Sequence, residues 1–383
     1  MTGAVTAAAL TCLLLAGTPA PALSGDAAPA GSYAFTAKLD IGDGRRACTG
    51  ALIDPFWVIT AASCFADDPS QPTTLPVGAP ALRTTVTVGR TDLTTAAGQV
   101  RDVVELLPRS DRDLVMARLA NPVTDITPLA MSTTAPVAGE ELRVTGYGRT
   151  KTEWVPDQLH SAAFTVGAIG PTGLAIAAKS PTDAAVCKGD TGGPALRQVG
   201  GHYELAALNS RSWQNNCLGA AETTHTGAYN TRTDDLGTWI QQTSAVDWKT
   251  PLVNTNSGKC LEIDSSLMTD GARAQQWTCH SLPTARWIFH WAGDGWEVRN
   301  SNSGKALEIE DSLVTEGASA QQWTFYNIPT QKWDLVKAAG GYVLKNRNSG
   351  KVLEIDDSLP TDGARAQQWT FYNIPTQKWS FSY

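Results

Sequence analysis

The sequence predicts an all-β protein with two domains, and three features lead to this prediction. From about residue 30 to residue 243, short runs rich in β-branched residues alternate with clusters of Gly, Pro, Asp and Thr, the spacing of strands and turns in a barrel or sandwich. Beyond residue 250 the chain repeats itself with a period of 46 residues. A length of 383 residues allows two domains that each bury their own core.

The N-terminus has the pattern of a secretory signal peptide. An apolar run at residues 7–16 is followed by Pro and small residues, and it is too short to span a membrane. We therefore expect residues 1–22 to be a signal peptide and the mature protein to be secreted to the extracellular space. The net charge of −7 leaves no basic stripe for a nucleic-acid backbone, so nucleic acid is not an expected partner.

The first domain follows as a series of short strands and one closing helix. The expected strands are AFTAKLDIG, WVITAAS, TTVTVGR, RDVVELL, ELRVTGYG, SAAFTVGAI and YELAAL. Helical periodicity occurs in TDDLGTWIQQ, Thr233–Gln242, where an Asp-rich first turn suits a helix N-terminus. We expect residues 23–243 to form the first domain, residues 244–250 a linker, and residues 251–383 the second domain.

The cysteines predict disulfides and not a metal site. Cys12 leaves with the signal peptide, and the six cysteines that remain can all pair in an oxidising compartment. A metal site would need Cys and His clustered at short spacing, which the sequence lacks, so neither a metal nor a cofactor is expected. The expected pairs are Cys48–Cys64, Cys187–Cys217 and Cys260–Cys279.

The second domain is built from three copies of one motif. The copies NSGKCLEIDSSLMTDGARAQQW, NSGKALEIEDSLVTEGASAQQW and NSGKVLEIDDSLPTDGARAQQW begin at Asn256, Asn302 and Asn348. An open solenoid would need distinct capping repeats, so three copies this similar favour a closed threefold arrangement.

The first domain resembles the chymotrypsin-fold (trypsin-like) serine peptidases over roughly residues 22–242. CTGALIDPFWVITAASC is similar to the segment that carries the catalytic His, and DRDLVMARL to the segment that carries the buried Asp. VTGYG is similar to a core turn, CKGDTGGPAL to the nucleophile loop, and SRSWQNNC to the wall of the primary specificity pocket, which places Ser212 and Trp213 there. Five motifs in the family's order imply its double β-barrel.

The resemblance assigns the three catalytic positions to Ser63, Asp113 and Thr191, with the amides of Gly189 and Thr191 as the oxyanion hole. The family mechanism needs an imidazole to take the proton of the nucleophile and a carboxylate to orient that imidazole. Asp113 is retained, but a hydroxyl at Ser63 cannot act as a general base near neutral pH. The extra methyl group of Thr191 stiffens its rotamer and crowds the attack path. These substitutions predict a catalytically inactive domain.

The alternative is an active secreted endopeptidase in which Thr191 works with another base. His160, His202 and His225 lie in other motifs, and Lys188 would need burial to lose its proton.

Two further positions depart from the family. The segment ALSGDA follows no Lys or Arg, so activation by a trypsin-like cut is not expected, although signal removal near Ala22 would expose an amine for Asp190. Ala185 at the base of the specificity pocket implies no preference for basic side chains.

The repeats resemble the units of ricin B-type β-trefoil carbohydrate-binding domains over residues 250–383. The family signature Q-x-W is present as QKW in the second and third copies and is ARW, at Ala285–Trp287, in the first. Such lobes bind sugar with an acidic side chain, an aromatic ring and side-chain amides. The resemblance assigns these roles to Glu262, Gln275 and Trp277, to Glu308, Gln321, Trp323 and Gln331, and to Glu354, Gln367, Trp369 and Gln377.

Two points stay open within the trefoil. Trp287, Trp333 and Trp379 are expected in the core, and the tryptophans of the QQW motifs are either core residues or sugar-stacking rings. If they are core, Tyr326, Tyr372 or His280 becomes the stacking residue. Because Ala285 removes an amide, the first lobe is expected to be the poorest site, and similar repeats favour several weak sites that act by avidity.

The leading hypothesis is a secreted protein that binds glycans or polysaccharide surfaces through the trefoil and carries an inactive peptidase-like domain. The old cleft of that domain is a possible site for a peptide or protein partner.

Overall fold

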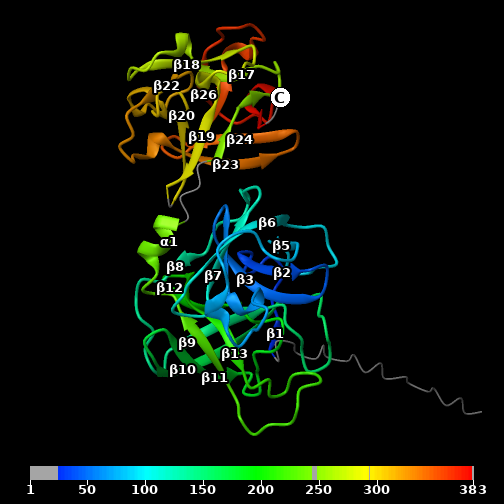
Figure 1. The fold of residues 1–383 in the computed structure, drawn as a ribbon. Coiled ribbons are helices and arrows are strands. Elements are labelled where there is room, and N and C mark those ends of the chain that lie inside the picture. The colour runs from blue at the N-terminus through cyan, green and yellow to red at the C-terminus, as the bar shows by residue number, and fades with distance from the viewer. Residues whose placement is uncertain (1–24, 244–247, 293, 382–383) are drawn as a thin grey trace, which may run out of the picture.

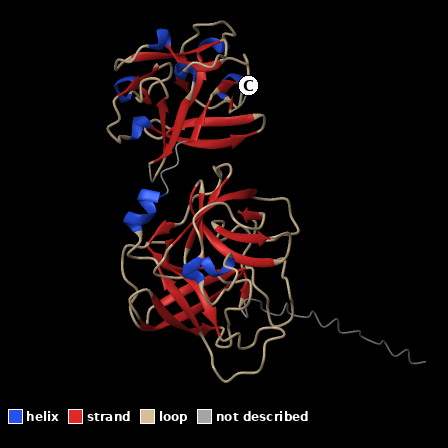
Figure 2. Cartoon of the chain, in the orientation of Figure 1, coloured by secondary structure: helices blue, strands red, loops and turns tan. Residues whose placement is uncertain are grey.

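The computed structural model describes residues 25–243, 248–292 and 294–381, and it has the all-β architecture that the sequence predicts (Figure 1). Strands make up both halves of the chain, and within these residues the one α-helix is α1 (Gly237–Thr243) (Figure 2). The expected signal peptide and linker residues 244–247 lie outside the described ranges.

The first barrel is a closed ring of six antiparallel strands in the order β2-β3-β4-β7-β6-β5. Their bounds are β2 (Thr36–Ile41), β3 (Arg46–Asp54), β4 (Trp57–Thr60), β5 (Thr84–Val88), β6 (Gln99–Pro108) and β7 (Val115–Leu119). Buried and partly exposed residues alternate along β2 and β5, so the strand period of two sends Leu39, Val86 and Val88 into the barrel core.

The second barrel closes in the same way through β9-β10-β11-β14-β13-β12, because β9 pairs with both β10 and β12. Its strands are β9 (Glu141–Gly146), β10 (His160–Ile169), β11 (Gly173–Ser180), β12 (Pro194–Val199), β13 (His202–Ser212) and β14 (Ala228–Arg232). The short strands β1 (Asp26–Ala27) and β8 (Ala130–Met131) pair with β10 and β13. The double barrel implied by the resemblance is therefore confirmed.

The two barrels are held together by polar contacts from their facing strands. The hydroxyls of Thr36 and Thr145 lie 2.9 Å apart, and the N–H of Thr49 donates to the carbonyl of Thr191 at 3.0 Å. These contacts bring the loops after β4, between β6 and β7, and before β12 to one junction.

The helix that ends this domain begins four residues later than predicted. The hydroxyl of Thr233 donates to the carbonyl of Leu205 at 3.2 Å, and Asp234 accepts two hydrogen bonds from Arg232 at 3.0 and 2.8 Å. These contacts hold Thr233 and Asp234 against the second barrel, so α1 starts only at Gly237.

The C-terminal domain contains thirteen short strands in one sheet with threefold repetition. They are β15 (Trp248–Thr250), β16 (Val253–Asn254), β17 (Cys260–Ile263), β18 (Ala272–Trp277), β19 (Trp287–Trp291), β20 (Trp296–Asn300), β21 (Ala306–Ile309), β22 (Ala320–Trp323), β23 (Lys332–Ala338), β24 (Gly341–Asn346), β25 (Val352–Ile355), β26 (Ala366–Trp369) and β27 (Trp379–Ser380). Short 3₁₀ turns follow the hairpin strands: η3 (Asp264–Ser266), η4 (Pro283–Ala285), η5 (Glu310–Ser312), η6 (Pro329–Gln331), η7 (Asp356–Ser358) and η8 (Pro375–Gln377).

Equivalent hydrogen bonds connect the three lobes into a closed ring. The side-chain amide of Gln322 donates to the carbonyl of Leu267 in the first lobe, and that of Gln368 to Leu313 in the second, at 2.8 and 2.9 Å. Gln276 of the first lobe donates to Leu359 of the third at 2.6 Å and completes the circle. The closed threefold arrangement is confirmed.

Three tryptophans, one from each lobe, lie in the core as expected. Trp287, Trp333 and Trp379 are fully buried, and their indole N–H groups donate to backbone carbonyls of β17, β21 and β25 at 2.9, 2.9 and 3.1 Å. Each buried ring therefore keeps its polar group satisfied while it fills the core.

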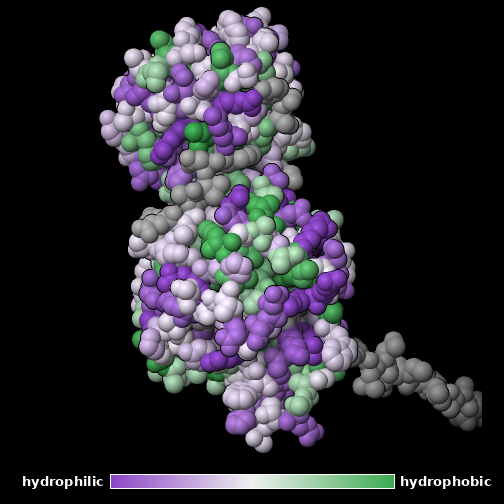
Figure 3. All heavy atoms as spheres, in the orientation of Figure 1, coloured by the Kyte–Doolittle hydropathy of each residue, from purple (hydrophilic) through white to green (hydrophobic). Residues whose placement is uncertain are grey.

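The three expected disulfides are present, joining Cys48 to Cys64, Cys187 to Cys217 and Cys260 to Cys279. Between the domains, the rings of Phe56 and Trp296 meet edge to face with centroids 6.2 Å apart. On the face shown in Figure 3, hydrophilic and hydrophobic residues are interspersed over both domains.

Candidate functional site

A cleft of about 1140 Å³ lies where the two barrels meet, and it contains all three residues assigned to catalytic positions. Ser63 comes from the turn η1 (Ala62–Cys64) after β4, and η1 is tied to β3 by the disulfide between Cys48 and Cys64. Asp113 lies between β6 and β7, and Thr191 lies just before β12. Ser63 and Thr191, which are far apart in the sequence, are thus brought to one surface.

Ser63 is fully engaged with Asp113. Its N–H donates to Oδ1 of Asp113 at 2.8 Å, and its hydroxyl donates to Oδ2 at 2.9 Å. The hydroxyl of Ser210, on β13, donates to the same Oδ2 at 2.7 Å. The carboxylate therefore receives three hydrogen bonds, and the single hydroxyl proton of Ser63 points at Asp113.

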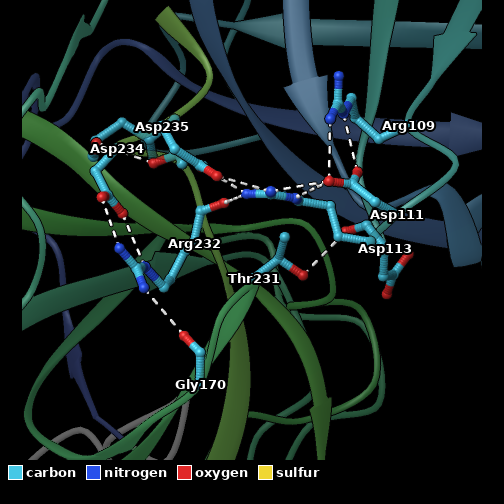
Figure 4. A network of polar contacts seen from close by, with 11 residues as sticks. Arg109, Asp111, Asp113, Gly170, Thr231, Arg232, Asp234 and Asp235 are labelled. Carbon is cyan, nitrogen blue, oxygen red and sulfur yellow. Dashed lines mark hydrogen bonds and ion pairs between the residues drawn. The ribbon is translucent and has the colours of Figure 1, made fainter.

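The loop that holds Asp113 is fixed by an arginine next to it (Figure 4). Arg112 is 7% exposed, and its guanidinium donates to both carboxylate oxygens of Asp235 at 2.7 and 2.8 Å and to Asp111 at 2.9 and 3.2 Å. Hydrogen bonds from Arg109, and then those from Arg112, hold the pKa of Asp111 well below its ordinary value. The hydroxyl of Thr231 donates to the backbone carbonyl of Asp113 at 3.1 Å. The two barrels thus clamp the Asp113 loop between them.

The backbone on either side of Thr191 turns at two glycines with positive φ. Gly189 has φ +100°, and a Cβ there would meet Cα of Gly148 at 2.7 Å; Gly192 has φ +81°, and a Cβ would meet the hydroxyl of Thr60 at 1.9 Å. Only glycine fits at these two positions. Among the described residues, neither the N–H of Gly189 nor that of Thr191 donates to a protein acceptor, so both amides remain available to an oxyanion.

Thr191 is not coupled to a base. In the described part of the chain its hydroxyl makes no hydrogen bond, and no histidine lines the cleft. His160 is 4% exposed within β10, where burial lowers its pKa to about 4. His225 stacks on Trp213, and the side chain of His202 is 63% exposed. Lys188 lines the cleft but is exposed, whereas lysine bases are buried.

Asp190 lies under the nucleophile loop and is fully buried. It accepts hydrogen bonds from the N–H groups of Cys187 and Gly148, each at 2.8 Å, and burial raises its pKa to about 7. The N-terminal amine considered as its partner belongs to residues outside the described ranges.

The base of the expected specificity pocket is apolar. Ala185 is 7% exposed and packs with the Cys187–Cys217 disulfide. Ser212 lines the cleft as expected, but Trp213 is 58% exposed and stacks on His225 instead of lining it. Arg211, the residue before Ser212, lines the cleft, and its guanidinium carbon lies 4.8 Å from the centroid of the Tyr229 ring.

In each trefoil lobe, a hairpin brings the assigned acid and the first assigned amide together. Glu262 is directly opposite Gln275 in the β17–β18 ladder, Glu308 opposite Gln321 and Glu354 opposite Gln367. The amide nitrogens donate to the carboxylates at 3.1, 3.0 and 3.1 Å, and each Glu is 6% exposed. Cross-strand register therefore builds the same acid–amide pair three times.

A second hydrogen-bond partner reaches each of these three glutamate carboxylates. In the second and third lobes Gln331 and Gln377 donate to Glu308 and Glu354, both at 2.8 Å. Burial raises the pKa of both of these glutamates.

In the first lobe a different residue fills this place. Nε2 of His280 lies 2.9 Å from Oε2 of Glu262, where the other lobes have a glutamine amide. His280 aligns with Tyr326 and Tyr372 in the repeats, and Ala285 aligns with the glutamines. Nδ1 of His280 is buried without a partner. Sequence comparison of the repeats showed the missing amide at Ala285, but not that His280 reaches its position.

The tryptophans of the QQW motifs are not core residues. Trp277 is 41% exposed, and Trp323 and Trp369 are partly exposed. A positive-φ glycine from the neighbouring lobe approaches each ring, with Gly271 near Trp323, Gly317 near Trp369 and Gly363 near Trp277.

The second lobe has the most accessible amide. Oε1 of Gln275 accepts a hydrogen bond from Arg273 at 3.1 Å, and that of Gln367 from Arg365 at 2.8 Å. Ser319 replaces the arginine in the second lobe, and no donor among the described residues reaches Oε1 of Gln321.

Within the described ranges, no group of three His, Cys, Asp or Glu side chains is arranged to hold a metal ion. None of the helices in those ranges is both long and apolar enough to cross a membrane.

The model of the trypsin family matches residues 22–240, more than half of the chain. The chain belongs to the trypsin family. The ricin-type β-trefoil lectin domain-like family matches residues 247–323 and 329–383, so the trypsin domain is followed by a ricin B-type lectin-like domain.

Curated relatives match within the trypsin domain. The serine protease SP24D of Anopheles gambiae is 30% identical over 39% of this chain and 58% of its own length. Human granzyme M is 32% identical over 40% of this chain and 64% of its own length. The chain thus spans less than two thirds of either protein. The snake venom serine protease KN5 of Trimeresurus stejnegeri is 28% identical over 57% of this chain and 85% of its own length.

Among solved structures, the designed threefold symmetric protein ThreeFoil matches at 30% identity with a TM-score of 0.35. The match covers 35% of this chain and 98% of that protein.

Proposed function

We propose that this protein is secreted, binds carbohydrate through its ricin B-type domain, and carries a trypsin-family domain without peptidase activity. Residues 1–22 would be the signal peptide, 23–243 the peptidase-fold domain and 251–383 the carbohydrate-binding domain. The three disulfides support an oxidising, extracellular destination.

The observation that carries the loss of activity is the contact of Ser63 with Asp113. Both donors of Ser63 are directed at the carboxylate, and Ser210 adds a third hydrogen bond. The carboxylate that would orient an imidazole instead holds two hydroxyls, neither of which can accept a proton from Thr191 near neutral pH. Without proton transfer, the amides of Gly189 and Thr191 would stabilise an oxyanion that does not form at a useful rate.

Carbohydrate binding is supported by the repeated arrangement of a buried acid, its amide and a partly exposed tryptophan. The carboxylates of Glu262, Glu308 and Glu354 are held by two donors each, which fixes their lone pairs for sugar hydroxyls. The rings of Trp277, Trp323 and Trp369 offer an apolar face for the C–H side of a pyranose. Gln331 and Gln377 are fully buried and would act by positioning the glutamates.

The second candidate is an endopeptidase that uses Thr191 and is tethered to glycan surfaces. Its support is the unaltered turn before Thr191, which leaves two amides available.

Hydrolysis of casein and of short acyl esters separates the two candidates. The wild-type protein is compared with Thr191→Ala and with a Ser63→His, Thr191→Ser double variant. Our proposal expects no turnover above Thr191→Ala in the wild type and measurable turnover in the double variant. Wild-type turnover that Thr191→Ala abolishes would reject the proposal in favour of the endopeptidase.

A glycan array tests the lectin assignment independently. We expect binding by the wild type that the Glu308→Ala, Glu354→Ala double variant weakens strongly, because only the first lobe then keeps its acid. Binding that this double variant leaves unaffected, or an array without any signal, would reject the proposed sites.

A further inference from the structure

The cleft of the trypsin domain is basic in a protein whose net charge is −7. Two carboxylates line it, Asp111 and Asp113. The cations that line it are Arg45, Arg46, Arg112, Arg149, Lys188 and Arg211.

Most of these cations have no carboxylate partner. Arg112 is paired with Asp111 and Asp235, as described above. For the other five, no carboxylate lies within ion-pair distance anywhere in the described ranges. Asp113 forms no ion pair with any of these five, and its oxygens accept hydrogen bonds from Ser63 and Ser210.

Neutral contacts hold several of these side chains in place along the cleft. Arg46 donates to the carbonyl of Ala66 at 2.6 Å, and Arg211 lies over Tyr229. Arg149 lies over Trp154 at 4.6 Å and donates to the carbonyl of Leu218 at 2.9 Å, while its Nε is buried without an acceptor. The guanidinium groups are thus preorganised without being neutralised, which lowers the cost of binding an anion.

The cleft also has a strand edge with one open side. β13 pairs with β12 as far as Leu208 and with β14 as far as Ser212, so residues 210–212 have a strand neighbour on one side. All three line the cleft. An extended peptide can pair with such an edge through its backbone, whereas a polysaccharide lacks the regularly spaced N–H groups that this pairing uses. Trp154 and Val155, which are 59% and 69% exposed, add apolar contact area on the cleft wall.

We propose that the cleft binds an extended, acidic peptide segment, with its backbone along residues 210–212 and its carboxylates facing Lys188, Arg211 and Arg149. Binding needs no bond to be broken, so it goes beyond carbohydrate binding and does not depend on whether Thr191 is competent.

Fluorescence anisotropy with labelled twelve-residue peptides tests this proposal on the full-length mature protein. The probe alternates Glu and Thr, and the matched peptides replace every Glu with Gln or with Lys. We expect the Glu peptide to bind about tenfold or more tightly than the Gln peptide and the Lys peptide not to bind. The preference is expected to shrink at high salt because exposed charges are screened.

A charge-matched pair of variants locates the site. Lys188→Gln with Arg211→Gln is expected to weaken binding of the Glu peptide by about tenfold. Lys249→Gln with Lys345→Gln removes the same charge from exposed positions on the trefoil and is expected to leave binding unchanged. Equal loss in both double variants would show attraction to overall charge and overturn the proposal.

Three further measurements complete the test. N-methylation of alternate residues removes backbone donors and is expected to weaken the Glu peptide, while equal affinity would overturn strand pairing at the β13 edge. Heparin or polygalacturonate that binds the cleft more tightly than the Glu peptide would overturn the choice of a peptide. Mass spectrometry of the recovered Glu peptide keeps the two proposals apart: cleavage would contradict the inactive domain, whereas loss of acidic selectivity would contradict the cleft proposal.

Discussion

Ser63 donates both its N–H and its hydroxyl to the carboxylate of Asp113, at 2.8 and 2.9 Å. At the position that the resemblance assigns to the catalytic base, Ser63 thus satisfies the carboxylate and offers nothing basic to Thr191. With the hydroxyl of Ser210 as a third donor, both oxygens of Asp113 are satisfied.

The Arg112 clamp predicts a large effect on stability. Arg112→Ala removes a buried guanidinium that bridges Asp111 and Asp235, and we expect a loss of about 2 to 3 kcal/mol in the free energy of unfolding. Arg112→Lys should be more stable than Arg112→Ala because it keeps the positive charge. It should be less stable than the wild type, because one ammonium cannot match two carboxylates. Urea unfolding measures both. The control is Arg83→Ala, an exposed pair with Asp102 that should cost less than about 1 kcal/mol; a similar small cost for Arg112→Ala would contradict the clamp.

Burial of Asp54 predicts that stability falls as pH rises. The side chain accepts a hydrogen bond from the N–H of Phe56 at 2.8 Å, and burial raises its pKa to about 7 from 3.8. Between these two pH values the folded state holds a proton that the unfolded chain has lost, so the contribution of Asp54 to stability decreases from pH 4 to 7. Asp190 acts in the same direction, and His160, with a pKa lowered to about 4, acts in the opposite direction between pH 4 and 6.5.

Asp54→Asn isolates the contribution of one group. The variant keeps an acceptor for Phe56 but cannot ionise, so its stability relative to wild type should rise by about 2 to 4 kcal/mol between pH 4 and 8. Chemical denaturation at both pH values measures the difference. Asp67→Asn, at an exposed position, serves as the matched control, and a pH-independent difference for Asp54→Asn would reject this explanation.

The two classes of tryptophan predict opposite phenotypes. Trp323→Ala should leave the trefoil folded and weaken binding to an immobilised polysaccharide by about tenfold, because avidity is lost with one lobe. Trp333→Ala empties a fully buried site and should cost about 3 to 5 kcal/mol of stability. Thermal unfolding and binding are measured on both variants. Intact binding in a folded Trp323→Ala protein would remove this ring from the proposed site.

Two substitutions should convert the first lobe into the arrangement of the other two. His280→Tyr with Ala285→Gln gives it the Tyr and Gln that the other lobes have, so the new amide should hold Glu262 as Gln331 holds Glu308. In a background with Glu308→Ala and Glu354→Ala, the converted lobe should bind sugar at least as well as the original. His280→Tyr alone leaves Glu262 without its second donor and should bind less. If it binds as well as the conversion, the role given to His280 is wrong.

Much of the fold was readable from local sequence. The strand pattern predicted a barrel or sandwich, the 46-residue period predicted the threefold ring, and the cysteines predicted all three disulfides. The two barrels were implied by the resemblance of five motifs. The motifs around Ser63, Asp113 and Thr191 assigned them to catalytic positions, and the structure brings all three to one cleft. The start of α1 was misplaced because contacts of Thr233 and Asp234 with distant strands outweigh a local capping signal.

The details of the sites depended on contacts between distant residues. His280 reaches Glu262 from eighteen positions away, and an alignment of the repeats pairs it with a tyrosine of different role. The position of Trp213 outside the cleft follows from its stack on His225, which no local pattern indicates. The excess of cations in the cleft could not be predicted from the sequence either, because these residues come from separate loops of both barrels.

Labelling of residue 191 with a fluorophosphonate tests the central claim most directly. An activated nucleophile attacks the phosphorus, expels fluoride and leaves a covalent adduct that mass spectrometry of the intact protein and its peptides can locate. We predict no adduct at Thr191 in the wild-type protein and one adduct per chain at residue 191 in the Ser63→His, Thr191→Ser variant. Stoichiometric labelling of wild-type Thr191 would contradict the account.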